Sequence, residues 1–238
     1  MALHNVSFDI ERGSITSIIG PNGAGKTTLF NVVSGIYPPD GGEVIYEGKD
    51  ITGNPPYKIC FMGITRTFQN LQVFENMSVL ENVMVGYHAL TSSEFVSCMV
   101  HSFKASREEK EAREKAREVL NSLNLIGREN HLGSSLPFGD QKRLELARAL
   151  VCHPRVILLD EPVAGLNISE TDEMSDLILK QKESGITIVL VEHDMNLVMK
   201  ISDMIVVLNY GQKIAEGPPE EIRDNKDVAA AYLGTMDS

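Results

Sequence analysis

The 238-residue chain lacks any long run of apolar residues. Its apolar runs stop at five or six residues, as at positions 204–208, whereas a membrane-spanning helix needs about twenty. The first residues also lack a basic stretch followed by an apolar one, so no signal peptide is visible. We therefore expect a cytoplasmic chain. If it works at a membrane, another subunit must hold it there.

Positive charge is also scarce. The chain carries 22 Lys and Arg against 33 Asp and Glu, a formal net charge of −11. A general nucleic-acid binder needs a basic surface that displaces counterions from phosphate, so this composition argues against a nucleic-acid partner. It does not exclude small anions, because a local basic pocket can lie on an acidic protein.

Cysteine is rare as well. Cys60, Cys98 and Cys152 are odd in number, lie far apart in the sequence and form no Cys-x-x-Cys pair. This pattern is typical of incidental thiols in a reducing compartment. No Gly/Ser linker, low-complexity tract or internal repeat is present. With 42% hydrophobic residues, the chain has the composition of a soluble globular protein.

The first 50 residues predict an antiparallel sheet joined to one strand–loop–helix unit. Residues 5–10 and 43–47 alternate apolar and polar side chains, as half-buried strands do. Residues 15–19 form an apolar strand that runs into glycine, and residues 64–68 also resemble a strand.

The middle of the chain predicts helices. Ser78 and Glu81 have capping-box spacing and should open a helix. Residues 104–123 are dense in balanced charge, which predicts a helix with a solvated face, and residues 141–151 predict another. The oppositely charged pairs at i,i+4 spacing are Glu109 with Arg113 and Glu111 with Lys115.

From residue 155 an α/β pattern returns. Residues 156–159, 186–191 and 204–208 are nearly unbroken apolar runs, which mark parallel strands covered on both faces. Helices are expected at about 169–183 and 194–201. We therefore predict one α/β domain over residues 1–238. Its catalytic core comprises 1–70 and 144–238, and a helical subdomain is inserted at 71–143.

A phosphate-binding pattern follows the strand at 15–19. It consists of Gly20, Pro21, Asn22, Gly23, Ala24, Gly25, Lys26, Thr27 and Thr28, here called the phosphate loop. It satisfies G-x-x-x-x-G-K-[ST]. Glycines let successive backbone N–H groups point at an anion, and the following helix adds its positive end. Lys26 supplies charge for the β- and γ-phosphates, and the Thr27 hydroxyl is placed for Mg²⁺.

Two carboxylates end the apolar strand at 156–159, namely Asp160 and Glu161. In P-loop ATPases the first such carboxylate holds Mg²⁺, usually through water. The second, one residue on, would polarise the attacking water as general base. An apolar strand ending in two acids is weak evidence by itself. Together with the phosphate loop it predicts nucleotide hydrolysis.

Further segments resemble the ATP-binding cassette (ABC) ATPases over nearly the whole chain. The signature region, usually Leu-Ser-Gly-Gly-Gln before a basic helix, is matched by Leu136, Pro137, Phe138, Gly139, Asp140 and Gln141. Gln69 stands at the Q-loop position, residues 163–167 resemble the D-loop, and His193 matches the H-loop histidine. The Ala-Gly-Leu-Asn, Glu-His-Asp-Met and Ala-Tyr-Leu-Gly segments are similar to the branched-chain amino acid importers.

The resemblance implies a P-loop NTPase (RecA-like) core that binds ATP and Mg²⁺. Two ATPase subunits would sandwich ATP head to tail, with Gly139 of one touching the γ-phosphate held by the other. Gln69 would sense Mg²⁺ and the attacking water, so that Thr27, Gln69 and Asp160 form the metal set. His193 would bind the γ-phosphate and hold Glu161 and the water in line.

The resemblance also implies partners. These are transmembrane permease subunits, a second ATPase subunit (identical or a sister chain) and, indirectly, a substrate-binding protein. The chain would then lie at the inner face of the cell membrane. It would power import of branched-chain or related hydrophobic amino acids, and the helical insert would pass motion to the permease.

Two features depart from the family pattern. Pro137 stands where most members carry a serine that binds the γ-phosphate, so we expect backbone N–H groups near Gly139 to suffice. Members also carry an upstream strand and an aromatic residue that stacks on adenine, and Met1 falls too late to include them. Phe8 is no substitute, because it alternates with Val6 and Ile10 as a core residue. We expect a truncated or misplaced start and weaker base binding, since stacking is worth about 1–3 kcal/mol.

Other functions remain open from the sequence. A related transporter ATPase for urea, amides or a lipopolysaccharide would share the same motifs. A soluble ABC ATPase acting on DNA or ribosomes would usually carry two cassettes or a long coiled-coil insert. A binding switch without turnover would lack Glu161 or His193, and both are present.

Overall fold

The computed structural model describes residues 2–68, 72–91 and 102–233. Its centre is a six-stranded sheet of order β4-β5-β6-β1-β7-β8. The first five strands in this order are parallel, and β8 is antiparallel to β7. The strands are β1 (Ile15–Ile19), β4 (Ile64–Arg66), β5 (Val156–Asp160), β6 (Thr187–Val191), β7 (Met204–Asn209) and β8 (Gln212–Gly217).

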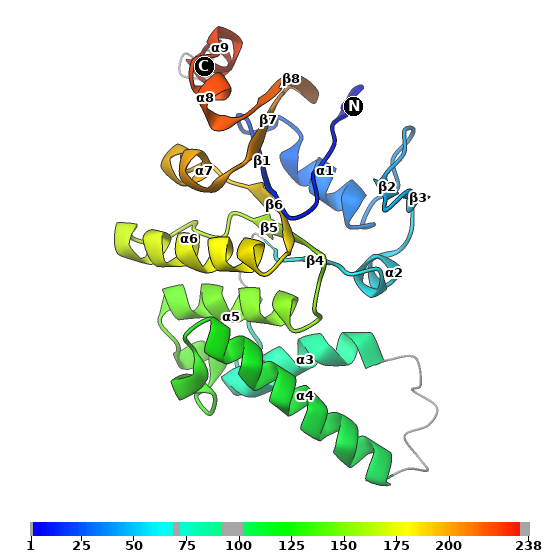
Figure 1. Ribbon diagram of the computed structural model, residues 1–238, viewed down its shortest axis with the longest axis vertical. Helices are drawn as coiled ribbons and strands as arrows, with labels where there is room; N and C mark the ends of the chain where they lie inside the picture. Colours follow the sequence, from blue (N-terminus) through cyan, green and yellow to red (C-terminus); the bar gives the residue numbers. More distant parts are fainter. Residues whose placement is uncertain (1, 69–71, 92–101, 234–238) are drawn as a thin grey trace.

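Helices lie on both faces of this sheet (Figure 1), with α1 on one side and α6 and α7 on the other. They are α1 (Lys26–Val33), α2 (Pro56–Phe61), α3 (Val79–Thr91), α4 (Ser102–Ser122), α5 (Phe138–Leu150), α6 (Ile168–Glu183), α7 (Met195–Ile201), α8 (Pro219–Arg223) and α9 (Lys226–Leu233). Two short 3-10 turns, η3 (Ile126–Arg128) and η4 (Gly133–Ser135), lie between α4 and α5. Among the described residues, no helix is both long enough and apolar enough to cross a membrane.

The central strands are buried on both faces. In β5, Ile157 and Leu159 pack into the cluster that contains Leu144 of α5, whereas Leu158 packs into the cluster that contains Phe30 of α1. Neighbouring β6 alternates between the same two clusters. This confirms the three parallel strands expected from unbroken apolar runs. It also brings the carboxyl ends of β1, β5 and β6 to one edge of the sheet.

Below the sheet, α3, α4 and α5 pack against one another. The predicted capping box at the start of α3 is confirmed, because the Ser78 backbone N–H and hydroxyl both donate to the Glu81 carboxylate at 2.8 Å. On α4, Ala112, Ala116 and Leu120 form a fully buried stripe with four-residue spacing. The charged positions between them face solvent, as the balanced charge run predicted.

One of the two predicted charge pairs on α4 is wrong. Arg113 contacts Glu109 at 3.3 Å, as expected. Glu111 instead accepts a hydrogen bond from the Tyr87 hydroxyl of α3, and Lys115 pairs with Glu118 at 3.0 Å. Packing of α3 against α4 supplies an alternative partner that i,i+4 spacing alone does not reveal.

The expected antiparallel region at the N-terminal end is smaller than predicted. Residues 5–10 form no strand: Asn5 has a left-handed backbone (φ 50°), and the segment has no ladder partner among the described residues. The strand expected at 43–47 shrinks to β2 (Ile45–Tyr46), which pairs with β3 (Lys49–Asp50) in a short hairpin. Phe8 does pack against the core cluster around α1, as its alternation with Val6 suggested, although Ile10 is exposed.

Two element boundaries also shift. The helix predicted at 141–151 begins earlier, at Phe138, because Pro137 serves as its N-cap with extended backbone (φ −53°, ψ 152°). The strand predicted at 64–68 ends at Arg66. The remaining predicted helices and strands of the second half agree with α6, α7, β6 and β7 within one residue at each end. The division into a core and a helical subdomain at 71–143 stays a prediction.

Candidate active site

The phosphate loop connects β1 to α1 and depends on its glycines. Gly20 has φ 151°, and a Cβ atom there would lie 2.0 Å from the Leu208 carbonyl oxygen. Gly25 is the N-cap of α1 with φ 105°, and Ala2 of the N-terminal segment lies against it. Only glycine meets both demands, of backbone angle and close approach. The predicted strand–loop–helix unit is therefore present.

Lys26 folds back into the loop. The residue is 6% exposed, and its ammonium donates to the carbonyl oxygens of Gly20 (2.6 Å) and Pro21 (3.1 Å). Burial lowers the pKa of Lys26, while the nearby charges of Glu161 and Asp160 oppose that shift. The structure thus brings the predicted phosphate-binding lysine and both predicted carboxylates into one electrostatic environment. Thr27 and Thr28 follow in the first turn of α1.

Asp160 ends β5 and is almost fully buried. Its carboxylate contacts the Arg66 guanidinium at 2.8 Å. Arg66 also donates to Asn31 of α1 and to Ser34, the residue that caps its C-terminal end. These contacts all use the terminal guanidinium nitrogens, and they help to offset the cost of removing two charges from water. Sequence reasoning missed Arg66, because a single arginine at the end of a short strand carries no motif.

Glu161 adopts a left-handed backbone, with φ 51°. Such a conformation is strained for a residue with a side chain and concentrates at functional sites. The Glu161 N–H donates to Val191 at the end of β6 (2.9 Å), and the carboxylate contacts His193 Nε2 at 3.0 Å. The predicted base and the predicted H-loop histidine are therefore hydrogen-bonded to each other, although they lie 32 positions apart in the sequence.

Glu192 was also missed from the sequence. It is 3% exposed, and its carboxylate accepts the N–H groups of Val163 (3.0 Å), His193 (2.8 Å) and Asp194 (3.4 Å). Burial raises the pKa of Glu192, and these N–H bonds oppose the shift. Glu192 thus joins the loop after β5 to the loop after β6. We call Asp160, Glu161, Glu192 and His193 the carboxylate edge.

The predicted signature residues lie at the start of α5. Pro137 and Phe138 are exposed, whereas Gly139 is buried and a Cβ atom there would meet the Glu170 carboxylate at 2.9 Å. Asp140 forms ion pairs with Arg128 and Arg143. Gln141 donates its side-chain amide to the Leu136 carbonyl oxygen at 2.9 Å.

Among the described residues, the signature residues make no polar contact with the phosphate loop of their own chain. Across residues 2–68, 72–91 and 102–233, no hydrogen bond or ion pair joins positions 136–141 to the phosphate loop. Gln69, the third predicted metal ligand, lies outside the described residues.

The remaining donors fit the predicted ligands. The Thr27 hydroxyl and the Asp160 carboxylate are hard oxygen donors of the kind that Mg²⁺ prefers. The phosphate loop offers a lysine and the first turn of a helix, the usual surroundings of bound phosphate. The chemistry of the site therefore suits a magnesium nucleotide.

Comparison with known proteins agrees with this geometry. Residues 3–164 match the family model of the ABC transporter. Residues 212–238 match that of the branched-chain amino acid ATP-binding cassette transporter. The chain is 45% identical to the high-affinity branched-chain amino acid transport ATP-binding protein BraF of Pseudomonas aeruginosa. It is 43% identical to LivG, of the same description, from Escherichia coli. Both matches span 235 residues, 98% of this chain and 92% of the relative.

Solved structures show the same fold. The ADP conformation of MJ1267, an ATP-binding cassette of an ABC transporter, matches with TM-score 0.86 and 35% identity, over 98% of this chain and 92% of that one. A dimeric post-hydrolysis state of the cassette MJ0796, bound to ADP and Pi, matches with TM-score 0.76 and 29% identity, over 92% and 90%. Because the family model covers more than half of the chain and the relatives nearly all of it, this protein belongs to the ABC transporter family as an ATP-binding cassette.

Proposed function

We propose that this chain is the ATP-hydrolysing subunit of an importer that carries branched-chain amino acids through a membrane permease. The observation that carries the proposal is the meeting of Lys26, Asp160 and the Glu161–His193 pair at one edge of the sheet. The relatives named for branched-chain amino acid transport support the substrate class. The subunit would work at the inner face of the cell membrane.

Each residue has a distinct task in hydrolysis. Lys26 and the loop N–H groups would hold the β- and γ-phosphates, while Thr27, Asp160 and Gln69 would hold Mg²⁺. When bound, Mg²⁺ neutralises charge on the phosphates. Glu161 accepts the proton of the attacking water, and His193 fixes the Glu161 carboxylate through their 3.0 Å contact. Catalysis then rests on positioning and charge stabilisation, as in phosphoryl transfer generally.

The signature residues act on a second subunit, either an identical copy or a sister chain. Among the described residues, no polar contact joins positions 136–141 to the phosphate loop of their own chain, which supports this assignment. Exposure of Pro137 and Phe138 supports it too, as does the dimeric relative. Because Pro137 has neither a hydroxyl nor an N–H group, Gly139 and the neighbouring backbone N–H groups would contact the γ-phosphate.

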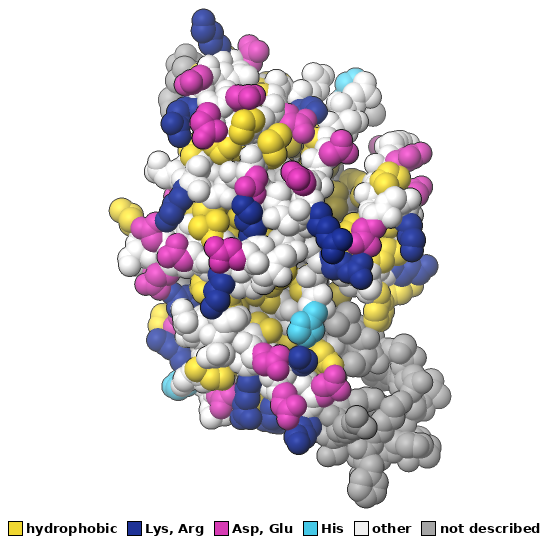
Figure 2. Space-filling view, viewed as in Figure 1, with side chains coloured by type: hydrophobic (Ala, Val, Ile, Leu, Met, Phe, Trp, Pro, Cys, Tyr) yellow, Lys and Arg dark blue, Asp and Glu magenta, His cyan; other side chains and the backbone are white. Residues whose placement is uncertain are grey.

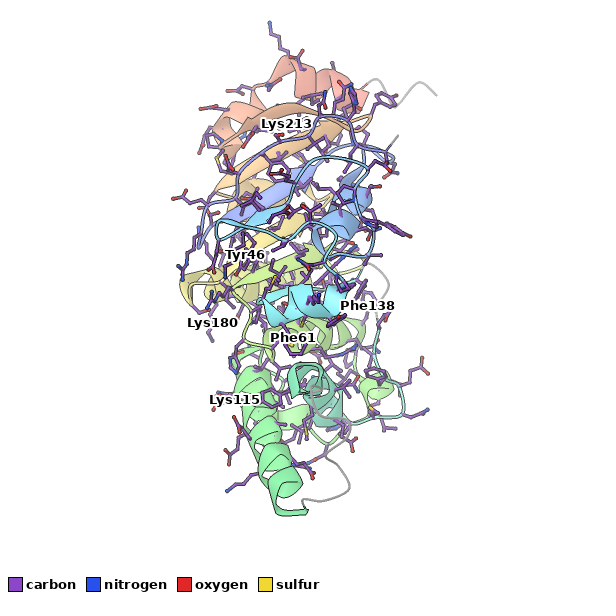
Figure 3. The ribbon with its side chains drawn as sticks, turned by 90° about the vertical axis from the view of Figure 1, so that its right-hand side faces the viewer. Tyr46, Phe61, Lys115, Phe138, Lys180 and Lys213 are labelled. Carbon is purple, nitrogen blue, oxygen red and sulfur yellow. The ribbon has the colours of Figure 1, made fainter. Side chains whose placement is uncertain are left out.

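A cavity marks where a permease would dock. It has a volume of about 320 Å³ and is lined by residues of α2, β4 and α5, among them Ile59, Arg66 and Arg148. Tyr57 and Phe61 of α2, the helix that contributes Ile59 to this cavity, are both exposed and add apolar surface. Figure 3 labels Phe61 on this helix. Large exposed apolar side chains that gather in one place typically mark an interaction site. On the face shown in Figure 2, acidic and basic side chains are interspersed, which does not favour a nucleic acid.

Hydrolysis by the full chain with ATP and Mg²⁺ tests the enzymatic part. Glu161→Gln keeps the shape but removes the base, so we expect turnover to fall about 10²–10⁴-fold while ATP binding is retained. Glu118→Gln, on the exposed face of α4, is the control and should leave turnover unchanged. Turnover by Glu161→Gln above a third of the wild-type rate would exclude Glu161 as the base.

Reconstitution in vesicles with permease subunits encoded beside this chain's gene tests the transport part of the proposal. We expect ATP-dependent uptake of radiolabelled leucine, and none with the Glu161→Gln subunit. Uptake of urea but not leucine would contradict the substrate class and leave the ATPase assignment intact.

A further inference from the structure

One buried cation has no part in the function described above. Lys142 lies in the second turn of α5, one turn after Phe138, and only 4% of it is exposed. Its ammonium donates to the backbone carbonyl oxygen of Glu161 at 3.3 Å. A lysine of the signature helix therefore touches the backbone of the proposed base in the same chain.

The surroundings of Lys142 hold it in place. Its ammonium lies 5.9 Å from the centre of the Phe138 ring, and the nearby Glu145 carboxylate attracts it. A buried ammonium is tolerated only when polar or charged partners compensate for lost water. Here a carbonyl oxygen, an aromatic face and a carboxylate do so together. The Lys142 side chain thus links the start of α5 firmly to the end of β5.

The backbone of Glu161 is strained and must be held in place by contacts such as the one from Lys142. Its left-handed conformation (φ 51°) persists only because surrounding contacts impose it. Its carbonyl oxygen accepts from Lys142 and from the Ala164 N–H at 3.2 Å. Because the backbone angles decide where the side chain points, releasing the carbonyl group would shift the carboxylate relative to His193.

Phe138 extends this link to the exposed surface of the molecule. Its ring packs against the loop that follows Glu161, since a Cβ atom on Gly165 would lie 3.0 Å from the ring. Phe138 itself is 45% exposed and lies where the lower helices meet the sheet (Figure 3). Whatever contacts the exposed ring can therefore act on Lys142 and on the Glu161 loop.

We propose that Lys142 is a positioning residue for Glu161. Through it, the signature helix of one chain sets the geometry of the base in that same chain. Docking of a second subunit on Phe138 and Gly139 would then change the position of the Glu161 carboxylate. This inference rests on the proposed function, because it takes Glu161 as the base.

Steady-state hydrolysis by the full chain with ATP and Mg²⁺ provides the test. Lys142→Met keeps the length of the side chain and removes its charge. We expect kcat to fall about tenfold and KM for ATP to stay within about twofold, the pattern of a group that matters only in the transition state. Lys142→Arg should recover at least half of the lost rate. Lys180→Met, an exposed lysine of α6, is the matched control and should behave as wild type.

A double-mutant cycle separates positioning from general support of the fold. If Lys142 acts through Glu161, Lys142→Met should cause no further loss when Glu161 is already glutamine. A further tenfold loss in that background, or a rise in KM with unchanged kcat, would overturn the proposal. Should the methionine variant fail to fold, Lys142→Gln replaces it in the same cycle. Full turnover by Glu161→Gln would instead refute Glu161 as the base, and this result is distinct from a failure of the Lys142 proposal alone.

Discussion

We propose that the phosphate loop and the carboxylate edge act on the same nucleotide, although the two are built in opposite ways. The phosphate loop is nine consecutive residues whose shape comes from glycine backbone angles and the start of α1. The carboxylate edge gathers side chains from the ends of two neighbouring strands, β5 and β6. Arg66 of β4 and Lys142 of α5 then hold it from two further elements.

Because of this difference, we expect phosphate binding and turnover to respond differently to movements elsewhere in the protein. A contiguous loop preserves its form when the rest of the protein moves, so it suits a group that must be held throughout the cycle. A site assembled from four elements changes whenever one of them shifts. Turnover should therefore respond to distant events more strongly than phosphate binding does.

The largest expected effect concerns the phosphate loop. Gly20→Ala would place a Cβ atom 2.0 Å from the Leu208 carbonyl oxygen, at a backbone angle that alanine avoids. We expect it to destabilise the fold by more than about 3 kcal/mol, the range of severe single substitutions, and to abolish ATP binding. Urea unfolding and binding of a fluorescent ATP analogue measure the two effects.

Gly23→Ala is the matched control, because a Cβ atom there meets nothing within 4 Å although φ is 79°. Its cost should be only the left-handed strain, about 1–2 kcal/mol. Equal damage from both substitutions would show that backbone angles alone, without the contact to β7, determine the loop.

An intermediate effect is expected at Glu192. Glu192→Ala leaves the N–H groups of Val163 and His193 without their acceptor. An unsatisfied buried group costs about 1–3 kcal/mol, as at Val163, and the substitution should also lower turnover. Glu192→Gln keeps an acceptor and should retain more of both. Equal turnover by the alanine variant and the wild type would show that Glu192 is not needed for hydrolysis.

The same residue predicts a dependence of stability on pH. Burial raises the pKa of Glu192 above its ordinary value of 4.5. The folded chain therefore binds more protons than the unfolded chain above that pH, and this contribution to stability is lost as pH rises through the folded pKa. Glu192→Gln removes the titration. Its unfolding free energy relative to wild type should rise between pH 4.5 and 7.5, and a fall would contradict the shift.

The smallest effect lies outside both regions and leaves stability untouched. Cys60 of α2 and Cys152, just after α5, line the same cavity, and their contact lowers the pKa of Cys60 to about 7. Because the thiolate is the reactive form, iodoacetamide labelling of Cys60 should rise with pH and reach half its maximal rate near pH 7. Mass spectrometry of the labelled peptide measures it.

Cys152→Ala provides the control for that pairing. Without the neighbouring thiol, the labelling midpoint of Cys60 should move up toward the ordinary thiol value of 9.0. The contact with Cys60 and burial both raise the pKa of Cys152, so Cys152 itself should stay nearly unlabelled. Equal labelling of both cysteines at pH 7 would contradict the contact.

What could be predicted from the sequence follows the same division between local and long-range structure. The phosphate loop, the Ser78–Glu81 capping box and the unbroken apolar runs of β5 and β6 are local patterns, and the structure contains each of them. Residues 5–10 alternate like a strand but form none, because alternation does not supply a pairing partner. Arg66, Lys142 and Glu192 act through partners far along the chain, so no spacing rule pointed to them. The roles assigned to the site residues stay predictions.

The two carbonyl bonds of Lys26 bear on selectivity among anions. An incoming ligand must compete for an ammonium that is already satisfied, so a single weak acceptor gains little by exchanging for a carbonyl oxygen. A polyphosphate offers several charged oxygens at once and also engages the loop N–H groups, which compensates for the displaced bonds. The loop is thereby biased against small anions with a single weak acceptor, such as chloride, before any base or sugar is recognised.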